Sequence, residues 1–281
     1  VLTLGDMEQH KMGGMLGVSQ GAHHPPAFII MRYTGNPGGA RIGIVGKGIT
    51  YDSGGLSLKP GNSMIEMHND MSGAAATIAA MGVIAARGLK ANVTAVVPAC
   101  ENMLANHGYR PGDIITQMSG KTVGIKSTDA EGRLVMADAL TWLCQKEDVA
   151  SILDIATLTG AAAAACGPLV VAAAMDGGFA EQTLDSAAGD AGNLTLKMPL
   201  PDDYMKYIKD DQADLANSTG GPVGMIGAAL FLKEFTEKKP WLHMDIAGSS
   251  TAIPGTDLNP TGTTGIGTAL LYHLVRQLAG C

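Results

Sequence analysis

The feature that most constrains the fold is an alternation of strand-like and helix-like segments, separated by glycine-rich turns, along the 281-residue chain. The predicted strands are residues 27–33, 41–46, 91–100, 151–157, 170–175 and 241–246. The predicted helices are residues 6–20, 71–87, 130–145, 179–191, 228–237 and 265–278, with a loop at 51–69. This alternation predicts an α/β fold, a three-layer sandwich in which helices flank a mixed, largely parallel central sheet.

Composition supports one globular domain and argues against two classes of partner. Hydrophobic residues make up 46% of the chain, enough for a sizeable core, and neither a repeat nor a low-complexity linker divides residues 1–281. The formal net charge is −7 and basic residues do not cluster, so we expect no nucleic-acid partner. The apolar runs are too short to span a bilayer, so we expect no membrane partner. The four cysteines form no CxxC pair and are predicted to be buried thiols in a reducing compartment.

Seven charged residues stand in glycine-rich, otherwise apolar sequence, although only 16% of the chain is charged. They are Lys47, Asp52, Lys59, Asp70, Asp129, Glu131 and Arg133. Charged groups are rarely buried unless they are paired or bind a metal. Oxygen-rich ligand sets suit Mg²⁺ and Mn²⁺, and Zn²⁺ also accepts carboxylates. Together these residues therefore suggest a site for two divalent cations.

Each of these residues taken singly has an ordinary structural explanation. A lysine that follows a strand, as Lys47 does, is usually exposed, and GIVGKG lacks the spacing of a phosphate-binding loop. Asp52 suits a turn, and Asp70 suits a helix N-cap. Thr128 and Glu131 fit a capping box that opens the predicted helix 130–145. No HExxH motif competes with the metal hypothesis, and the histidines have no ligand-like spacing.

Five motifs follow one another along the chain: VGKGITYDSGGLSLKP, MHNDMSGAAA, STDAEGRLVMADAL, DIATLTGA and the C-terminal TGTTGIGTALLYHLV. In sequence and in order they resemble the M17 family, the leucyl or cytosol aminopeptidases. The resemblance covers essentially the whole chain. It implies that residues 1–281 are a catalytic metallo-aminopeptidase domain without the family's separate N-terminal domain. It also implies a cytoplasmic homohexamer. Because the chain begins at Val1, the native N-terminus and any targeting peptide stay open.

The resemblance also implies a ligand set for two divalent ions, Zn²⁺ or Mn²⁺, with Mg²⁺ a further candidate. One metal site is expected to use Lys47, Asp52, Asp70 and Glu131. The other is expected to use Asp52, Glu131 and Asp129, including the backbone carbonyl of Asp129. Asp52 and Glu131 would then bridge the two ions.

Catalytic and substrate-binding positions are implied in the same way. Lys59 is expected to polarise the scissile carbonyl, and Arg133 to hold a bicarbonate that acts as general base. The substrate-pocket positions are Met67, Ser127, Thr157, Leu158 and Gly160. Two features depart from the family pattern: Ser127 stands where Asn is usual, and the pair His68-Asn69 replaces the more usual residues.

The implied reaction is removal of the N-terminal residue of peptides, preferentially leucine and other apolar residues, by a water that two metals bridge. Two alternatives stay open. A non-catalytic, oligomeric DNA-binding or assembly role is one, because some enzymes of this fold also act as DNA-binding assembly factors. A two-metal phosphoesterase is the other, since it fits the ligand chemistry but not the motif order.

Overall fold

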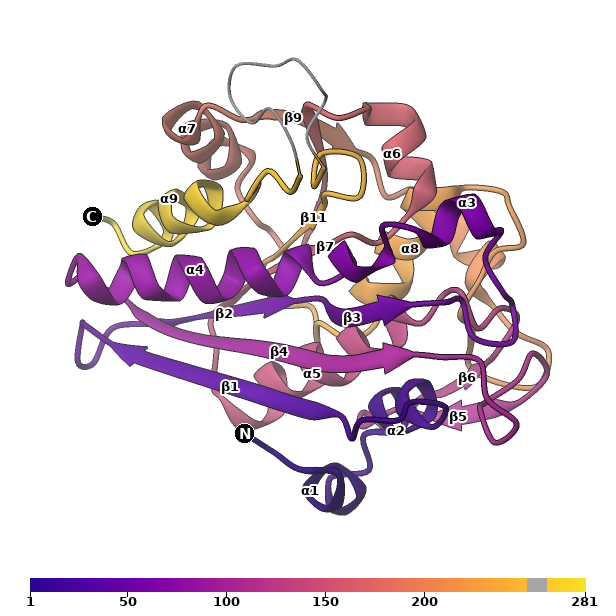
Figure 1. Cartoon of the computed structure of the whole chain (residues 1–281). Helices are drawn as coiled ribbons and strands as arrows, with labels where there is room; N and C mark the ends of the chain where they lie inside the picture. The colour runs from indigo at the N-terminus through magenta and orange to yellow at the C-terminus, as the bar shows by residue number, and fades with distance from the viewer. Residues whose placement is uncertain (252–261) are drawn as a thin grey trace.

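An eight-stranded sheet forms the middle layer of the computed structural model, which describes residues 1–251 and 262–281 (Figure 1). Its order is β1 (Ala27–Thr34), β4 (Asn92–Asn102), β2 (Arg41–Gly46), β7 (Ser151–Ala156), β11 (Trp241–Asp245), β8 (Val170–Asp176) and β9 (Leu194–Met198), with β3 (Gly48–Asp52) also paired to β4. The pairs β1–β4 and β11–β8 are antiparallel, and the other pairs are parallel. The prediction of a mixed, largely parallel sheet is confirmed.

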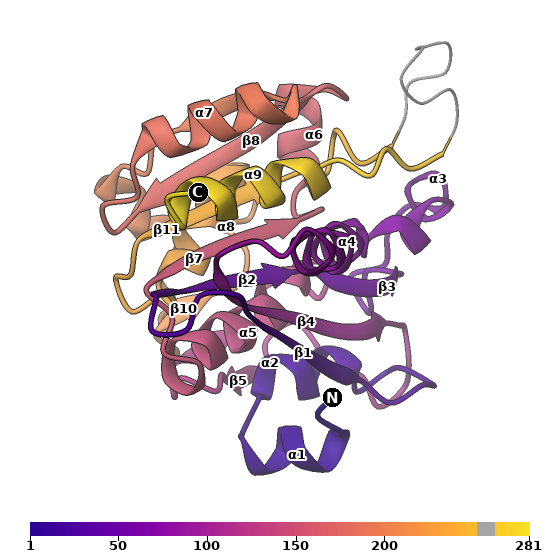
Figure 2. The same ribbon diagram turned by 90° about the vertical axis from the view of Figure 1, so that its left-hand side faces the viewer.

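Helices cover both faces of the sheet, as Figure 2 shows from the side. One core packs α4 (Ser72–Ala86), α7 (Glu181–Ala191) and α9 (Thr268–Leu278) against residues such as Ile44 and Leu153. The other packs α2 (Gly13–Ser19), α5 (Gly132–Lys146) and α8 (Gly224–Lys233) against residues such as Val45 and Ile152. Neighbouring residues of one strand thus enter opposite cores, because successive side chains of a strand point to opposite faces. The predicted three-layer sandwich is confirmed.

The structure also contains several short elements, most of them outside the predicted ones. They are α1 (Leu4–Gln9), α3 (Gly61–Met64), η1 (Met67–Asn69), α6 (Gly160–Cys166) and η2 (Asp202–Ile208), and a second sheet of β10 (Leu215–Ala216), β6 (Thr122–Gly124) and β5 (Ile114–Thr116). The predicted helix 6–20 is two helices, α1 and α2, because the chain turns at Lys11 with a positive φ of 55°. The predicted loop 51–69 contains the end of β3 as well as α3 and η1.

Two further expectations need correction. The four cysteines are all free, but only Cys100 is buried: Cys144 and Cys166 are partly exposed, and Cys281 is exposed. The capping box at Thr128 is also wrong: α5 begins at Gly132, and the Thr128 hydroxyl instead donates to the carbonyl of Gly54. Of the C-terminal motif 261–275, Thr261 lies outside the described residues. Within the described ranges, every helix is too short or too polar to cross a membrane.

Candidate metal centre

The ends of three parallel strands place the charged residues at one edge of the sheet. Lys47 directly follows β2, Thr157 directly follows β7, and Asp52 is the last residue of β3. Glu131 lies immediately before α5, and Asp70 lies between η1 and α4. Carboxyl ends of parallel strands meet at one edge of a sheet, which is where α/β proteins build their sites. The structure therefore brings these five residues together, as the strand order requires.

Lys47 occupies the buried centre of this cluster. Its Nζ donates to Asp70 Oδ1 at 2.9 Å and to the carbonyl oxygen of Thr157 at 2.9 Å. It also lies 3.0 Å from Glu131 Oε1. The side chain is 3% exposed, so the expectation that a lysine after a strand is exposed is wrong here. Asp70 does not cap α4 either, because its Oδ1 also accepts a hydrogen bond of 2.8 Å from the Thr157 hydroxyl.

The charges of this buried group depend on one another. Burial opposes the charge of Lys47, but the carboxylates of Asp70 and Glu131 outweigh it, so the pKa of Lys47 is raised. Burial raises the pKa of Asp70 to about 7, and Lys47 opposes the rise while Glu131 adds to it. The ammonium of Lys47 therefore bridges the carboxylates of Asp70 and Glu131.

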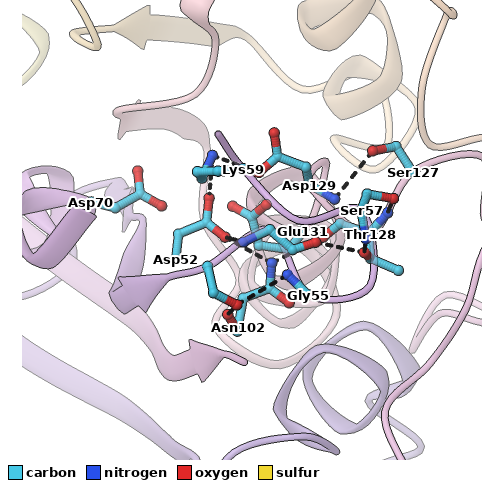
Figure 3. Close-up of polar contacts among 12 residues, drawn as sticks. Asp52, Gly55, Ser57, Lys59, Asp70, Asn102, Ser127, Thr128, Asp129 and Glu131 are labelled. Atoms are coloured by element: carbon cyan, nitrogen blue, oxygen red, sulfur yellow. Dashed lines mark hydrogen bonds and ion pairs between the residues drawn. The ribbon is translucent and has the colours of Figure 1, made fainter. Parts of the chain in front are cut away.

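Lys59 forms a second ammonium bridge, nearer to solvent (Figure 3). Its Nζ lies 2.8 Å from Asp52 Oδ2 and 2.5 Å from Asp129 Oδ1. Burial opposes the charge of Lys59, but the carboxylates of Asp52 and Glu131 outweigh it, so its pKa is raised. Burial likewise raises the pKa of Asp129 to about 6, against the effect of Lys59. The cluster thus sets two lysines among four carboxylates.

The donor set fits a divalent cation. Asp52, Asp70 and Glu131 each offer a carboxylate oxygen, and these oxygens all lie within 4.8 Å of one another. Glu131 Oε2 is buried and has no hydrogen-bond partner among the described residues. A buried carboxylate oxygen without a partner is costly, and a hard cation at this point would satisfy it. The geometry therefore fits a cation site in which Lys47 bridges the carboxylates of Asp70 and Glu131.

Asn102, which sequence reasoning missed, fixes the orientation of Asp52. It is fully buried at the end of β4. Its Nδ2 donates to Asp52 Oδ1 at 2.7 Å and to the carbonyl of Thr128 at 2.9 Å (Figure 3). Asp52 Oδ1 also accepts from the backbone nitrogen of Gly54 at 2.9 Å, so the predicted turn at Asp52 is present as well. Groups that orient ligands in this way tune metal affinity.

Two further buried residues hold the loops of the site. The amide of Asn217 accepts from the backbone of Lys126 at 2.8 Å and donates to the carbonyl of Ser127 at 2.6 Å, which fixes the loop before Asp129. Asp245, at the end of β11, accepts from Leu158 N at 3.1 Å and from Thr159 Oγ1 at 2.7 Å. No local pattern marks Asn217 as a site residue. Asp245 does end a buried strand beside β7, a signal that could have found it.

The predicted substrate residues share one cavity with the charged cluster. This cavity has a volume of about 390 Å³, and Met67, Thr157, Leu158 and Gly160 line it together with Lys47, Asp52, Lys59, Asp70, Asp129 and Glu131. A larger hollow of about 660 Å³ lies between α2 and β5, but none of these charged residues lines it.

Two predicted residues do not line the cavity. Ser127 turns its Oγ toward the backbone nitrogen of Asp129, at 3.2 Å. Arg133 is buried in the first turn of α5, and its Nε has no partner among the described residues. Burial lowers the pKa of Arg133 to about 10, although Glu131 and Asp245 oppose this. The guanidinium is therefore still charged at neutral pH, close behind the carboxylates.

Comparisons with known proteins agree on one family. Residues 1–272 match the cytosol aminopeptidase family, catalytic domain. The probable cytosol aminopeptidase of Alkaliphilus oremlandii (strain OhILAs) is 46% identical over 279 residues, covering 99% of this chain and 56% of that protein. That of Clostridium perfringens (strain 13 / Type A) is 46% identical over 273 residues, covering 96% of this chain and 55% of that protein. The chain thus spans about half the length of these curated relatives.

A solved structure shows the same fold. The bottromycin maturation enzyme BotP aligns with a TM-score of 0.90 at 33% sequence identity. The alignment covers 98% of this chain and 60% of the BotP chain. The likeness therefore extends over nearly all of the sequence.

Proposed function

Because the chain belongs to the cytosol aminopeptidase family, we propose that it is the catalytic part of a metal-dependent aminopeptidase. The observation that carries the proposal is the convergence of Asp52, Asp70 and Glu131 around two lysines in one open cavity. Since the chain spans about half the length of its relatives, the proposal is made for residues 1–281 as a catalytic domain.

The chain's own residues would hold two divalent cations. We assign Lys47, Asp52, Asp70 and Glu131 to one ion, and Asp52, Asp129 and Glu131 to the other. Bound there, the ions would polarise a carbonyl and lower the pKa of a water. Lys47 can act as a ligand only as a neutral amine, so its proton must leave when the site fills. Family membership supports Zn²⁺ or Mn²⁺, with Mg²⁺ a further candidate.

Lys59 and Arg133 would supply positive charge to the reaction. Lys59 pairs with Asp52 and Asp129, and with cations held by those carboxylates its ammonium would be free to stabilise the oxyanion that develops on the scissile carbonyl. Arg133, charged and with its Nε unpartnered among the described residues, is the assigned site for a bicarbonate that takes the proton of the attacking water.

The proposed substrates, substrate-binding residues, cellular location and oligomeric state rest on family membership together with the cavity lining. Peptides are the proposed substrates, and a first residue such as leucine fits the apolar lining of Met67, Leu158, Ala163 and Ala247. Ser127, Thr157 and Gly160 are assigned to substrate binding. We further propose a cytoplasmic homohexamer. Family membership does not favour the DNA-binding role or the phosphoesterase.

The deciding experiment is release of leucine from leucinamide by chelator-stripped protein, titrated with Mn²⁺. Turnover that appears only with added metal supports the proposal. The variant Glu131→Ala should lose turnover at saturating metal, because both proposed ions share this carboxylate. Near-normal activity of that folded variant would show that the ligand assignment is wrong.

A further inference from the structure

The cavity that holds the charged cluster is also lined by uncharged polar side chains. Three of them, those of Asn69, Ser250 and Thr251, form what we call the polar wall. They come from η1 and from the turn that follows β11, and they share the cavity with the apolar Met67 and Ala163. The pocket for a substrate side chain therefore has two chemically different walls.

Asn69 and Thr251 form a pair across this polar wall. The Nδ2 of Asn69 donates to the Oγ1 of Thr251 at 3.0 Å. This bond leaves the Thr251 hydroxyl proton and the Asn69 Oδ1 without a partner among the residues that the structure describes. The side chain of the neighbouring Ser250 makes a long contact of 3.4 Å to the carbonyl of Ala247. Hydroxyl and amide groups both donate and accept, so the pair can offer either function to a ligand.

The charge around the cavity narrows the class of side chain that this pair would take. Five carboxylates line the cavity, and the proposed cations would neutralise four of them, those of Asp52, Asp70, Asp129 and Glu131. The fifth, Glu66, is assigned to no ion and would repel an acidic first residue. The pair itself is neutral, so it has no partner charge for a lysine or arginine. A neutral amide matches the donor and the acceptor together. Glutamine carries this group at the end of an unbranched side chain as long as that of methionine.

We propose that Asn69 and Thr251 determine specificity, and that they admit glutamine as a first residue alongside leucine. The inference rests on the proposed aminopeptidase function and extends its substrate class to peptides with an amide-ended first residue. An apolar pocket would reject glutamine, because its amide would be buried without a partner. In this cavity, hydrogen bonds to Asn69 and Thr251 would offset the free energy that the glutamine amide loses on leaving water.

The test compares the dipeptides Gln-Gly, Met-Gly and Leu-Gly as substrates of the metal-loaded full chain. Gln-Gly should be hydrolysed with a kcat/KM within about tenfold of that for Leu-Gly. In Thr251→Val and Asn69→Leu, the ratio of Gln-Gly to Met-Gly should fall about tenfold, the value of one neutral hydrogen bond. Thr195→Val, the same substitution on the edge strand β9, is the matched control and should leave the ratio unchanged.

The outcomes separate the two proposals. If no dipeptide is hydrolysed at any metal concentration, the aminopeptidase function fails and this inference fails with it. If Leu-Gly is hydrolysed but Gln-Gly is not, or if both variants keep the wild-type ratio, the aminopeptidase stands and the polar wall is not a specificity determinant. Preference for Lys-Gly over Gln-Gly would also overturn the inference, because it would point to the exposed Glu66 at the cavity.

Discussion

Gly132→Ala tests whether the position of Lys47, and not only its presence, is needed at the site. A Cβ at residue 132 would lie 2.5 Å from Lys47 Cε, 2.7 Å from Nζ and 2.9 Å from Cδ. Carbon atoms in contact are ordinarily about 3.5–4.0 Å apart, so the end of Lys47 must move by about 1 Å. The side chain is buried between Asp70 and Glu131, so this movement carries Nζ away from its partners.

The expected loss of metal affinity and activity follows from this movement of the Lys47 side chain. Misplacing a catalytic or ligating group by about 1 Å can cost about 100-fold in rate, and disturbed metal sites commonly lose 10- to 100-fold in affinity. We therefore expect Gly132→Ala to weaken Mn²⁺ binding by at least tenfold and to lower kcat/KM for leucinamide about 100-fold. The fold should survive, since a flexible side chain and not backbone is displaced, at a cost of about 1–3 kcal/mol in the free energy of unfolding.

The assay combines a metal titration followed by activity with urea unfolding of the metal-free protein. Gly82→Ala is the matched control, because a Cβ there meets nothing within 4 Å on the outer side of α4. This control should keep full activity and gain stability of about 0.5–1 kcal/mol from helix propensity. If folded Gly132→Ala keeps metal affinity and kcat/KM within threefold of wild type, Lys47 is not a ligand in the position assigned to it.

Three further predictions concern residues outside the ligand set. Asn102→Leu should weaken metal affinity about 10- to 100-fold in an Mn²⁺ titration, because it removes the donor that orients Asp52; unchanged affinity would refute that role. Asp245→Asn should raise KM more than it lowers kcat in steady-state kinetics, because it loosens the loop after β7, and an unchanged KM would contradict this. Burial opposes ionisation of Glu147, but the hydrogen bond from Arg32 outweighs it and lowers the pKa of Glu147 below its ordinary 4.5. Its stabilising effect is thus present above that pH and lost below it, so the urea-midpoint advantage over Glu147→Gln should shrink between about pH 6 and pH 3; a constant advantage would count against the ion pair.

The local pattern of apolar and polar residues was enough to predict the long helices and strands. The predicted strand 41–46 is β2 with the same bounds, and the predicted helices 71–87 and 130–145 correspond to α4 and α5. Short elements such as β5 and β10 were missed, because two or three residues carry no readable period. The capping box failed because the Thr128 hydroxyl found partners 74 residues away, at Gly54, which local sequence does not reveal.

The fold class and the types of side chain at the site follow from the amino-acid order alone. Alternating strands and helices require a layered sheet, and a lysine or carboxylate directly after a strand must lie at its carboxyl edge. Lys47 could be placed at that edge in this way, because it follows the predicted strand 41–46, whereas Asp52 and Glu131 were named as charged residues in glycine-rich, otherwise apolar sequence.

The buried groups that orient these charged side chains come from distant parts of the chain, so they depend on the packing of the whole fold. β4 lies between β1 and β2, so it carries Asn102 to Asp52, 50 residues away in sequence. The same packing sets Asn69 against Thr251 across 182 residues. Such contacts have no local signature, because they arise from the order of strands in the sheet and not from the residues beside them. The charged residues of the candidate site were therefore predictable from sequence, whereas the orientation of their side chains and the polar wall of the cavity were not.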